Sequence, residues 1–497
     1  MTGEPVRRGL LDTNVMILRS RIAPEELPDE MAISAVTLAE LSAGAHEVRP
    51  ESQQDTYFEA AERARRLDIL QRAEHEFDPI PFDTDAMGDN AVSRRAAGSR
   101  RSKAPRAGAA AAVAAVIALT GTACGTVSSG ASARAEAPAV IVLKQGANNS
   151  NGNIFITPSG GSVSGPEIIS NTGKVIWFHP LPAHELAADF RTQTYQGKPV
   201  LSWWQGPPDL GAVSGGADLI YNDRYQKIAE VKGGNGYSAD GQEFLITPWN
   251  TALILADTIT TANLTSMGGP ADQKVVDSIV QEIDISTGKV LFQWNAADHV
   301  PYRDSEQPRP ASAATPWNWF YINAVHLDTD GNLLISARYA WAVYKVNLHT
   351  GNIMWVLGGK HSTFRIKAGP GQVLDKAGEI FAYQHDPEPI RNGEYTVFDD
   401  ESDGGSGLLP YSRVVTVRLD PATKVATLVK SVRQPEGLLA TEEGNAQTTR
   451  NGDLFVGWGD VPFISEFSPT GQLLFNAQFP GVDITYRAYR LPWHPAA

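Results

Sequence analysis

The sequence predicts a mainly β protein whose larger part, residues 136–497, forms a six-bladed β-propeller. Three observations lead to this prediction. Helical periodicity is scarce after residue 136, short runs of Val, Ile, Tyr, Trp and Phe alternate with Gly, Asn and Asp turns, and one turn-plus-strand phrase occurs six times. The propeller is expected to follow a small α/β fragment (1–86) and a signal or anchor segment (87–135).

The repeated phrase is a tight turn followed by alternating apolar residues. Its clearest copies are TGKVIW, TGKVLF, TGNIMW and TGQLLF, which begin at Thr172, Thr287, Thr350 and Thr470. Glycine takes the positive φ that such a turn needs, and the alternation is typical of an outer strand. Successive clear copies are separated by two, one and two repeat units, each of about 60 residues. Weaker copies at 225–229 and 423–427 fill the two gaps.

Six four-stranded units are expected to close into a ring, because ring closure removes exposed strand edges. A pair of large β-sandwiches is the alternative that the same strand pattern allows.

The composition limits the classes of function. The chain has 497 residues, of which 42% are hydrophobic, so it is long enough for two or three domains. Its net charge of −14 disfavours general binding to nucleic acid, and no nucleic-acid partner is expected for the propeller. The single cysteine, Cys124, excludes a disulfide framework within one chain.

Residues 87–135 have the order of a secretory signal. Basic residues between 94 and 106 precede an uncharged, Ala-rich run at 107–123. The tetrapeptide that ends at Cys124 (GTAC) resembles a lipoprotein box in which the cysteine is lipidated, and 133–135 offers a cleavage site for free secretion. We therefore expect an extracytoplasmic protein, either secreted or attached to the membrane by its signal or lipid anchor.

The alternative for this segment is an Ala-rich linker or a buried helix. A signal should begin a chain, whereas this one follows a long N-terminal piece. A gene fusion, or a true start at Met87, would explain the order.

Several motifs occur in a specific order in the third piece. They are NWFYINAV (318–325), DTDGNLLISAR (328–338), WVLGGK (355–360), YQHD (383–386) and TVFDD (396–400), preceded by GNG (234–236), DGQEF (240–244) and DHVP (298–301). With these motifs, roughly residues 140–490 resemble the bacterial and fungal arylsulfotransferase family. The resemblance implies a six-bladed propeller that moves a sulfuryl group from an aryl sulfate to a phenol through a sulfated histidine. It implies no cofactor for the propeller, and a small aromatic sulfate or phenol as the partner.

The resemblance also implies roles for individual residues. His385 matches the histidine that becomes sulfated, while Arg338 and Asn323 match the clamp on the sulfonate oxygens. Tyr321 and Gln242 stand where the family usually has histidine. Tyr321 is expected to act as a proton donor, although a phenol is a sluggish base at neutral pH.

Substrate contacts are expected from Gln242, from Tyr339 beside Arg338, and from Trp319. Tryptophans such as Trp203 and Trp341 are either stacking surfaces for an aryl group or ordinary blade packing. Because a histidine beside an aspartate is also a common structural pair, a non-catalytic binding or scaffold propeller is the alternative function.

The N-terminal piece carries a second resemblance. LLDTNV (10–15), ISAVTLAEL (33–41) and IPFD (80–83) resemble a PIN-domain toxin ribonuclease, in which carboxylates hold Mg²⁺ or Mn²⁺. Asp12 and Glu40 match the first two ligands, so magnesium is expected only if this piece is active. The region that carries the later acids is missing. Residues 1–86 are therefore interpreted as an inactive ribonuclease remnant or as an unrelated small α/β cap.

Overall fold

The computed structural model describes residues 8–11, 27–28, 30–33, 37, 137–146, 152–161, 163–207, 215–391, 393–404, 407–481 and 483–496. The chain divides into two compact units, Met1–Ala131 and Ser132–Ala497. In the first unit, β1 (Arg8–Leu11) pairs in parallel with β2 (Glu30–Ile33). Asp12, Glu40, Cys124 and the segment 87–135 lie outside the described residues, so the predictions made for them stay predictions.

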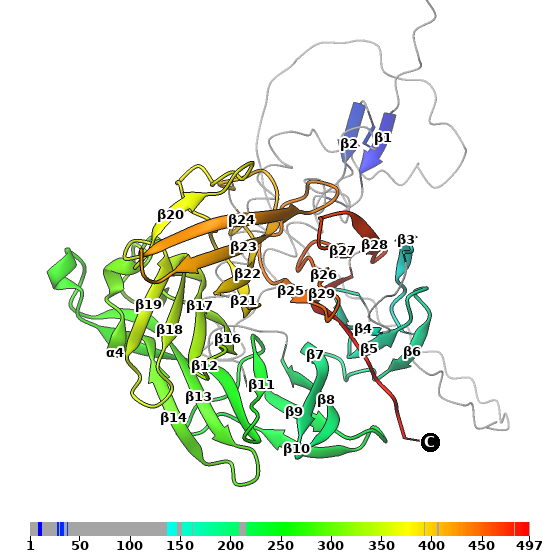
Figure 1. The fold of residues 1–497 in the computed structure, drawn as a ribbon, viewed down its shortest axis with the longest axis horizontal. Coiled ribbons are helices and arrows are strands. Elements are labelled where there is room, and N and C mark those ends of the chain that lie inside the picture. Colours follow the sequence, from blue (N-terminus) through cyan, green and yellow to red (C-terminus); the bar gives the residue numbers. More distant parts are fainter. Residues whose placement is uncertain are drawn as a thin grey trace, which may run out of the picture. The chain divides into compact units, whose positions relative to one another are not determined.

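The second unit consists of six antiparallel sheets arranged around one axis (Figure 1). Each sheet is a blade of four strands counted outward from the axis. The innermost strands are β7 (Leu186–Tyr195), β11 (Phe244–Ile246), β16 (Ile322–Leu327), β21 (His385–Pro389), β25 (Asn445–Thr448) and β29 (Ile484–Leu491). The second strands are β4 (Asn153–Ser159), β8 (Lys198–Gly206), β12 (Thr251–Ala262), β17 (Leu333–Ala337), β22 (Glu394–Asp399) and β26 (Leu454–Gly457).

The outer half of each blade follows the same order. The third strands are β5 (Glu167–Ile169), β9 (Ala217–Tyr221), β13 (Gln273–Asp284), β18 (Ala342–Val346), β23 (Arg413–Asp420) and β27 (Phe463–Phe467). The fourth strands are β6 (Val175–Phe178), β10 (Lys227–Val231), β14 (Val290–Asn295), β19 (Ile353–Gly358), β24 (Val425–Arg433) and β28 (Leu473–Gln478). The six-bladed propeller predicted from the sequence is confirmed.

A few short elements supplement the blades. They are β15 (Trp317–Asn318), β20 (Arg365–Ala368), α4 (Ala296–His299), and three 3₁₀ turns: η3 (Thr265–Met267), η4 (Tyr302–Asp304) and η5 (Arg338–Ala340). None of the helices among the described residues has the length and apolar character needed to cross a bilayer.

All six copies of the repeated phrase lead into fourth strands. The glycines of the four clear copies have φ values between 71° and 86°. The weaker copies place Tyr225 (φ 58°) and Lys424 (φ 51°) in the same left-handed region. A non-glycine residue is destabilised in this region by about 1 kcal/mol. The turn therefore keeps its left-handed geometry at Tyr225 and Lys424 in spite of this cost.

The two ends of the chain close the ring. The C-terminal strand β29 pairs with β4 and becomes the innermost strand of the blade that β4 begins. The N-terminal strand β3 (Ile141–Lys144) pairs with β28 and extends the neighbouring blade outward. These pairings make a closed ring and exclude the pair of sandwiches.

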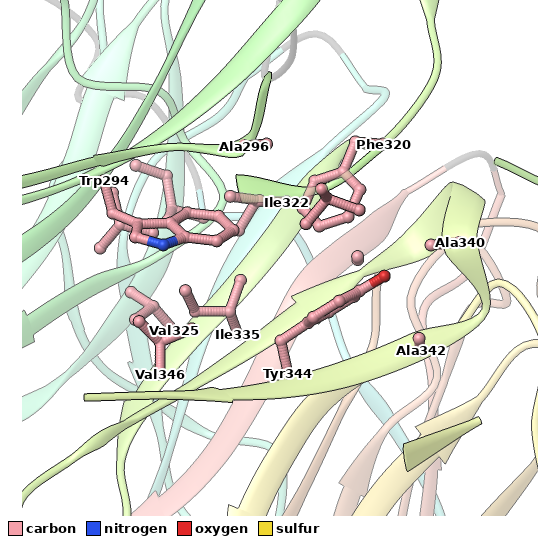
Figure 2. Close-up of a cluster of buried hydrophobic side chains, with 14 of the residues drawn as sticks. Trp294, Ala296, Phe320, Ile322, Val325, Ile335, Ala340, Ala342, Tyr344 and Val346 are labelled. Atoms are coloured by element: carbon pink, nitrogen blue, oxygen red, sulfur yellow. The ribbon is translucent and has the colours of Figure 1, made fainter. Parts of the chain in front are cut away.

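The blades are held together by apolar side chains on their facing surfaces. In the largest cluster, Trp294 lies beside Ile322 and above Val325 and Ile335, and Tyr344 lies on the same lower side (Figure 2). All five residues are buried. Because burying each large side chain stabilises the fold by roughly 2 kcal/mol, this packing fixes neighbouring inner strands relative to one another.

Candidate functional site

The candidate residues converge where the inner strands begin. A blade of four antiparallel strands returns the chain to the end at which it started, so each inner strand starts at the same end of the axis. Gln242 precedes β11, Tyr321 precedes β16, His385 begins β21, and Tyr486 lies near the start of β29. Together with Arg338, which follows β17, we call these residues the His385 cluster.

His385 is almost completely buried and is held at both ring nitrogens. Its Nδ1 lies 2.8 Å from Oδ2 of Asp400, and its Nε2 accepts a hydrogen bond of 3.3 Å from the backbone N–H of Glu443. This arrangement places the ring proton on Nδ1 and the lone pair on Nε2. Burial and the positive charges of Arg338 and Arg487 lower the pKa of His385 well below its ordinary value. The imidazole is therefore neutral at neutral pH, which is the form a nucleophile needs.

Arg338 is buried and keeps an unused donor. Its Nη2 donates to the carbonyl oxygens of Thr441 at 2.6 Å and Ser402 at 3.4 Å. The guanidinium carbon lies 5.1 Å from the ring centre of Tyr339 and 5.3 Å from that of Tyr383. Among the described residues, nothing accepts a hydrogen bond from its Nε. This side chain is thus a buried cation with a free N–H group, as an anion site requires.

The second predicted clamp residue, Asn323, is already engaged, and a further unmatched donor lies beside Tyr383. Asn323 is completely buried, and its Nδ2 donates to the carbonyl oxygen of Gln384 at 2.8 Å. Trp341 packs edge-on against Tyr383, with ring centres 5.2 Å apart, and no acceptor within the described ranges reaches its buried Nε1. Arg338 and Trp341 therefore both present unmatched N–H donors beside Tyr383.

Tyr321 belongs to a chain of hydrogen bonds. The hydroxyl of Tyr486 donates to Oε1 of Gln242 at 2.9 Å, and Nε2 of Gln242 donates to the hydroxyl oxygen of Tyr321 at 3.0 Å. Because the Tyr321 oxygen already accepts this bond, its own hydrogen is free for another acceptor. Burial and the nearby Tyr339, whose ring stacks on it at 5.4 Å, raise the pKa of Tyr321 well above its usual value. Tyr321 is thus a hydrogen-bond donor and a very weak acid.

Family comparison fits this geometry. Residues 191–480, more than half of the chain, match the model of the family described as arylsulfotransferase (ASST). The chain belongs to the arylsulfotransferase family. No curated protein matches the sequence.

Solved structures similar to this arylsulfotransferase-family chain are distant. A protein of unknown function from Bacteroides caccae is 13% identical with a TM-score of 0.40, covering 68% of this chain and 97% of that one. A streptogramin B lyase is 8% identical with a TM-score of 0.34, covering 68% and 87%. A nidogen/laminin complex is 10% identical with a TM-score of 0.38, covering 69% and 99%.

Trp319 lies apart from the His385 cluster of this arylsulfotransferase-family propeller. Its ring is completely buried, 4.6 Å from the ring of Tyr302 and 5.0 Å from that of Phe320. The structure thus places Trp319 in the core between blades, while Tyr339 and Gln242 do lie in or against the cluster. One tryptophan, Trp341, does pack against the ring of Tyr383. It is one of the five tryptophans considered as stacking surfaces, which are Trp203, Trp204, Trp317, Trp319 and Trp341.

A second buried group, which sequence reasoning missed, lies on the inner strands. We call it the ion-pair network: Asp189, Arg191, Glu243, His326, Asp386 and Arg487. Arg487 Nη1 lies 2.8 Å from Glu243 Oε2, and Arg191 Nη2 lies 2.9 Å from Asp189 Oδ2 and also pairs with Glu243. Three carboxylates thus face three basic side chains, so the ionised network carries no net charge.

His326 is the connecting member of the ion-pair network. Its Nε2 lies 3.1 Å from Asp386 Oδ1 and 3.3 Å from Glu243 Oε2. Burial opposes its charge, but Glu243 and Asp386 together raise the pKa of His326 to about 10. The ligand atoms of these three residues lie within 4.8 Å of one another and could hold a metal ion. A proton on His326 already balances the two carboxylates, so the network needs no metal for charge neutrality.

Proposed function

We propose that the propeller transfers a sulfuryl group from an aryl sulfate ester to a phenol, with Nε2 of His385 as the intermediate carrier. The observation that carries this proposal is the neutral, buried imidazole whose Nδ1 is held by Asp400 beside the unmatched N–H of Arg338. A nucleophile, its orienting group and an anion donor are the parts that the reaction requires.

In the first step, Nε2 forms a bond to sulfur while the bond from sulfur to the aryl oxygen breaks. The aryl oxygen keeps the electron pair and departs as a phenolate. Arg338 stabilises the sulfonate oxygens, and Tyr321 donates a hydrogen bond to the departing oxygen. Asp400, whose pKa is raised well above its ordinary value by burial, holds Nδ1 and keeps the ring oriented as it becomes positive. The hydrogen bond from Glu443 to Nε2 must break first, and at 3.3 Å it is weak.

In the second step, the oxygen of an acceptor phenol attacks sulfur and releases its proton to water. The bond between nitrogen and sulfur breaks, and its electrons return to Nε2. Because Tyr321 is a very weak acid, the leaving phenolate must be stable by itself. We therefore expect a strong preference for donors whose phenol is acidic, such as 4-nitrophenyl sulfate.

A non-catalytic binding propeller is the second candidate, and one observation favours it. Gln242 replaces a family histidine and is held on both sides, by Tyr486 and by Tyr321. A site locked in this way keeps its shape but has lost a group that transfers protons. In that case the His385 cluster binds aryl sulfates without turning them over.

We further propose that the protein acts outside the cytoplasm. Support comes from the sequence alone, in the basic flank and apolar run that end at Cys124. Metabolic labelling with a radioactive or clickable fatty acid distinguishes the two forms: a lipoprotein incorporates label at Cys124, whereas a secreted form does not.

The activity test uses the full-length chain with 4-nitrophenyl sulfate and a phenol acceptor. The wild type and a His349→Ala control, in which an exposed histidine is removed, are expected to release 4-nitrophenolate. His385→Ala is expected to release none. Saturable binding of the donor without release would instead establish the binding propeller, and release by His385→Ala would reject His385 as the carrier.

A further inference from the structure

A cavity of about 630 Å³ lies at the end of the axis opposite to the His385 cluster. We call it the far-end cavity. Its lining comes from the later residues of the inner strands, including Thr192 and Thr194 of β7, Ile246 of β11, Glu388 of β21, Gln447 of β25 and Leu491 of β29. Such a volume is in the range that holds a small organic molecule.

The ion-pair network reaches the far-end cavity through Arg191. Arg191, a member of the network, and Tyr489, which donates to Asp189 at 2.7 Å, both line the cavity and are buried. The rim residues Thr194, Pro248 and Asn250 are exposed. The far-end cavity is therefore open to solvent at its rim and borders the ion-pair network at Arg191.

Most polar groups in the lining are already engaged. Gln447 exchanges two hydrogen bonds with the backbone of Arg490, and Gln193 bonds to Ser202, Phe244 and Ile246. Arg191, the one cation among the lining residues, pairs through Nη2 with Asp189 and Glu243, while its Nε meets no acceptor among the described residues. Apart from this one N–H group, these side chains shape the cavity and have little capacity left for a ligand.

Glu388 is the acidic residue of the lining. It is half-buried in the lining, and within the described part of the chain no hydrogen bond or ion pair engages its carboxylate. The neighbouring ion-pair network is neutral as a whole, so it supplies no spare cation. Glu388 thus adds a carboxylate with no hydrogen-bond or ion-pair partner among the described residues to a cavity that also has apolar walls from Leu245, Pro248 and Leu491.

We propose that the far-end cavity is a second binding site, and that it takes a small organic ammonium compound whose apolar body lies against Leu245, Pro248 and Leu491. The carboxylate of Glu388 is its counter-ion. Charge-assisted hydrogen bonds from an ammonium group to a partly buried carboxylate are among the stronger ones in proteins. This site does not depend on sulfuryl transfer at His385.

Charged groups from the neighbouring inner strands act on Glu388. Asp386 on the same strand and Glu243 are negative, whereas His326 of β16 and Arg191 of β7 are positive.

Calorimetric titration of the full-length protein with phenethylamine tests this site. Phenethylamine is cationic, apolar at its other end and lacks a phenolic hydroxyl, so it is not a sulfuryl acceptor. The matched neutral probe is 2-phenylethanol. Glu388→Gln keeps the size of the side chain and removes its charge, and Glu230→Gln, on the outer strand β10, is the control.

The expected result is that Glu388→Gln binds phenethylamine at least about tenfold more weakly at pH 8, while Glu230→Gln binds like the wild type. The two substitutions should leave the weak binding of 2-phenylethanol unchanged. A Leu491→Trp variant, which fills the cavity, should weaken both probes. Circular dichroism melting confirms that each variant is folded.

Three outcomes would overturn the proposal. They are the absence of saturable phenethylamine binding to folded wild type, equal affinity of Glu388→Gln and wild type, and binding that Leu491→Trp leaves unchanged. Loss of 4-nitrophenolate release by His385→Ala bears on the proposed function and not on this site, so the two proposals fail separately.

Discussion

Replacing Glu243 with glutamine tests the role of the ion-pair network in stability. Glu243 is completely buried and meets Arg191, Arg487 and His326 at once. The substitution keeps the shape of the side chain and removes one of three negative charges. The network is left with three basic groups against Asp189 and Asp386, and one positive charge is uncompensated.

The expected loss can be worked out in two ways. Removing one partner from a buried ion pair typically costs about 3–5 kcal/mol. Separately, the rise in the pKa of His326 from 6.5 to about 10 corresponds to about 5 kcal/mol of folding stability, to which Glu243 is the largest favourable contributor. We therefore expect Glu243→Gln to lower the free energy of unfolding by about 3 kcal/mol or more at neutral pH.

The pH dependence has a definite sign. The pKa of His326 is raised on folding, so its stabilising effect is complete below about pH 6.5 and is lost as the pH rises through about 10. The wild type should thus lose stability between neutral and strongly alkaline pH. In Glu243→Gln the folded-state pKa of His326 falls, so this loss should be smaller and should be complete closer to neutral pH.

Urea unfolding followed by tryptophan fluorescence measures these changes. All 11 tryptophans lie at or after Trp177, so the signal reports on the propeller and not on residues 1–136. Glu230→Gln is the control for a glutamate outside the network. A loss below about 1 kcal/mol in Glu243→Gln, within the range of ordinary surface substitutions, would refute this account of the network.

Three further predictions concern the site and the ring. Tyr321→His should speed the release of unactivated phenols from their sulfates by about 100-fold, because imidazole can protonate the leaving phenolate. Steady-state rates with phenyl sulfate and with 4-nitrophenyl sulfate measure this effect. An equal increase for both donors would contradict the prediction. Arg338→Met should lower kcat/KM for 4-nitrophenyl sulfate by about 100-fold, whereas unchanged kinetics would remove Arg338 from the sulfonate clamp. Deleting residues 484–497 removes β29 and exposes the edge of β4, so size-exclusion chromatography should show aggregates; a monomer with a cooperative fluorescence transition would show that the ring tolerates an open edge.

The outer parts of the blades could be predicted from the sequence because they depend on local structure. A turn followed by an alternating strand, as at Gly351 and 353–358, needs only neighbouring residues to form. Ring closure could not be predicted in the same way, since β29 and β3 pair with strands at the other end of the chain. The repeat count implied a closed ring but not which strands complete it.

The His385 cluster was predictable in part because its motifs occur in a recognisable order. The ion-pair network was not, because it depends on irregular strands. In β29 the register slips between Thr485 and Ala488, and the adjacent residues Tyr486 and Arg487 both reach the segment 242–243. Strict alternation would place them on opposite faces.

A similar slip lies between Ile322 and Ala324 in β16. It allows both Asn323 and His326 to contact neighbouring inner strands while Val325 packs in the core. Positive φ values at Asp189, Tyr321 and Asp386 accompany these irregular starts. Single-sequence patterns carry no signal for such bulges, so the pairing of His326 with Glu243 and Asp386 could not be predicted.

The proposal that His385 carries the sulfuryl group is tested most directly by the mass of the intact protein. Full-length protein is mixed with 4-nitrophenyl sulfate in the absence of an acceptor, and the mass is recorded before and after a phenol is added. The account predicts one added sulfuryl group, mapped to His385, that disappears when the phenol arrives and never forms on His385→Ala. Turnover without this adduct, or an adduct on another residue, would contradict it.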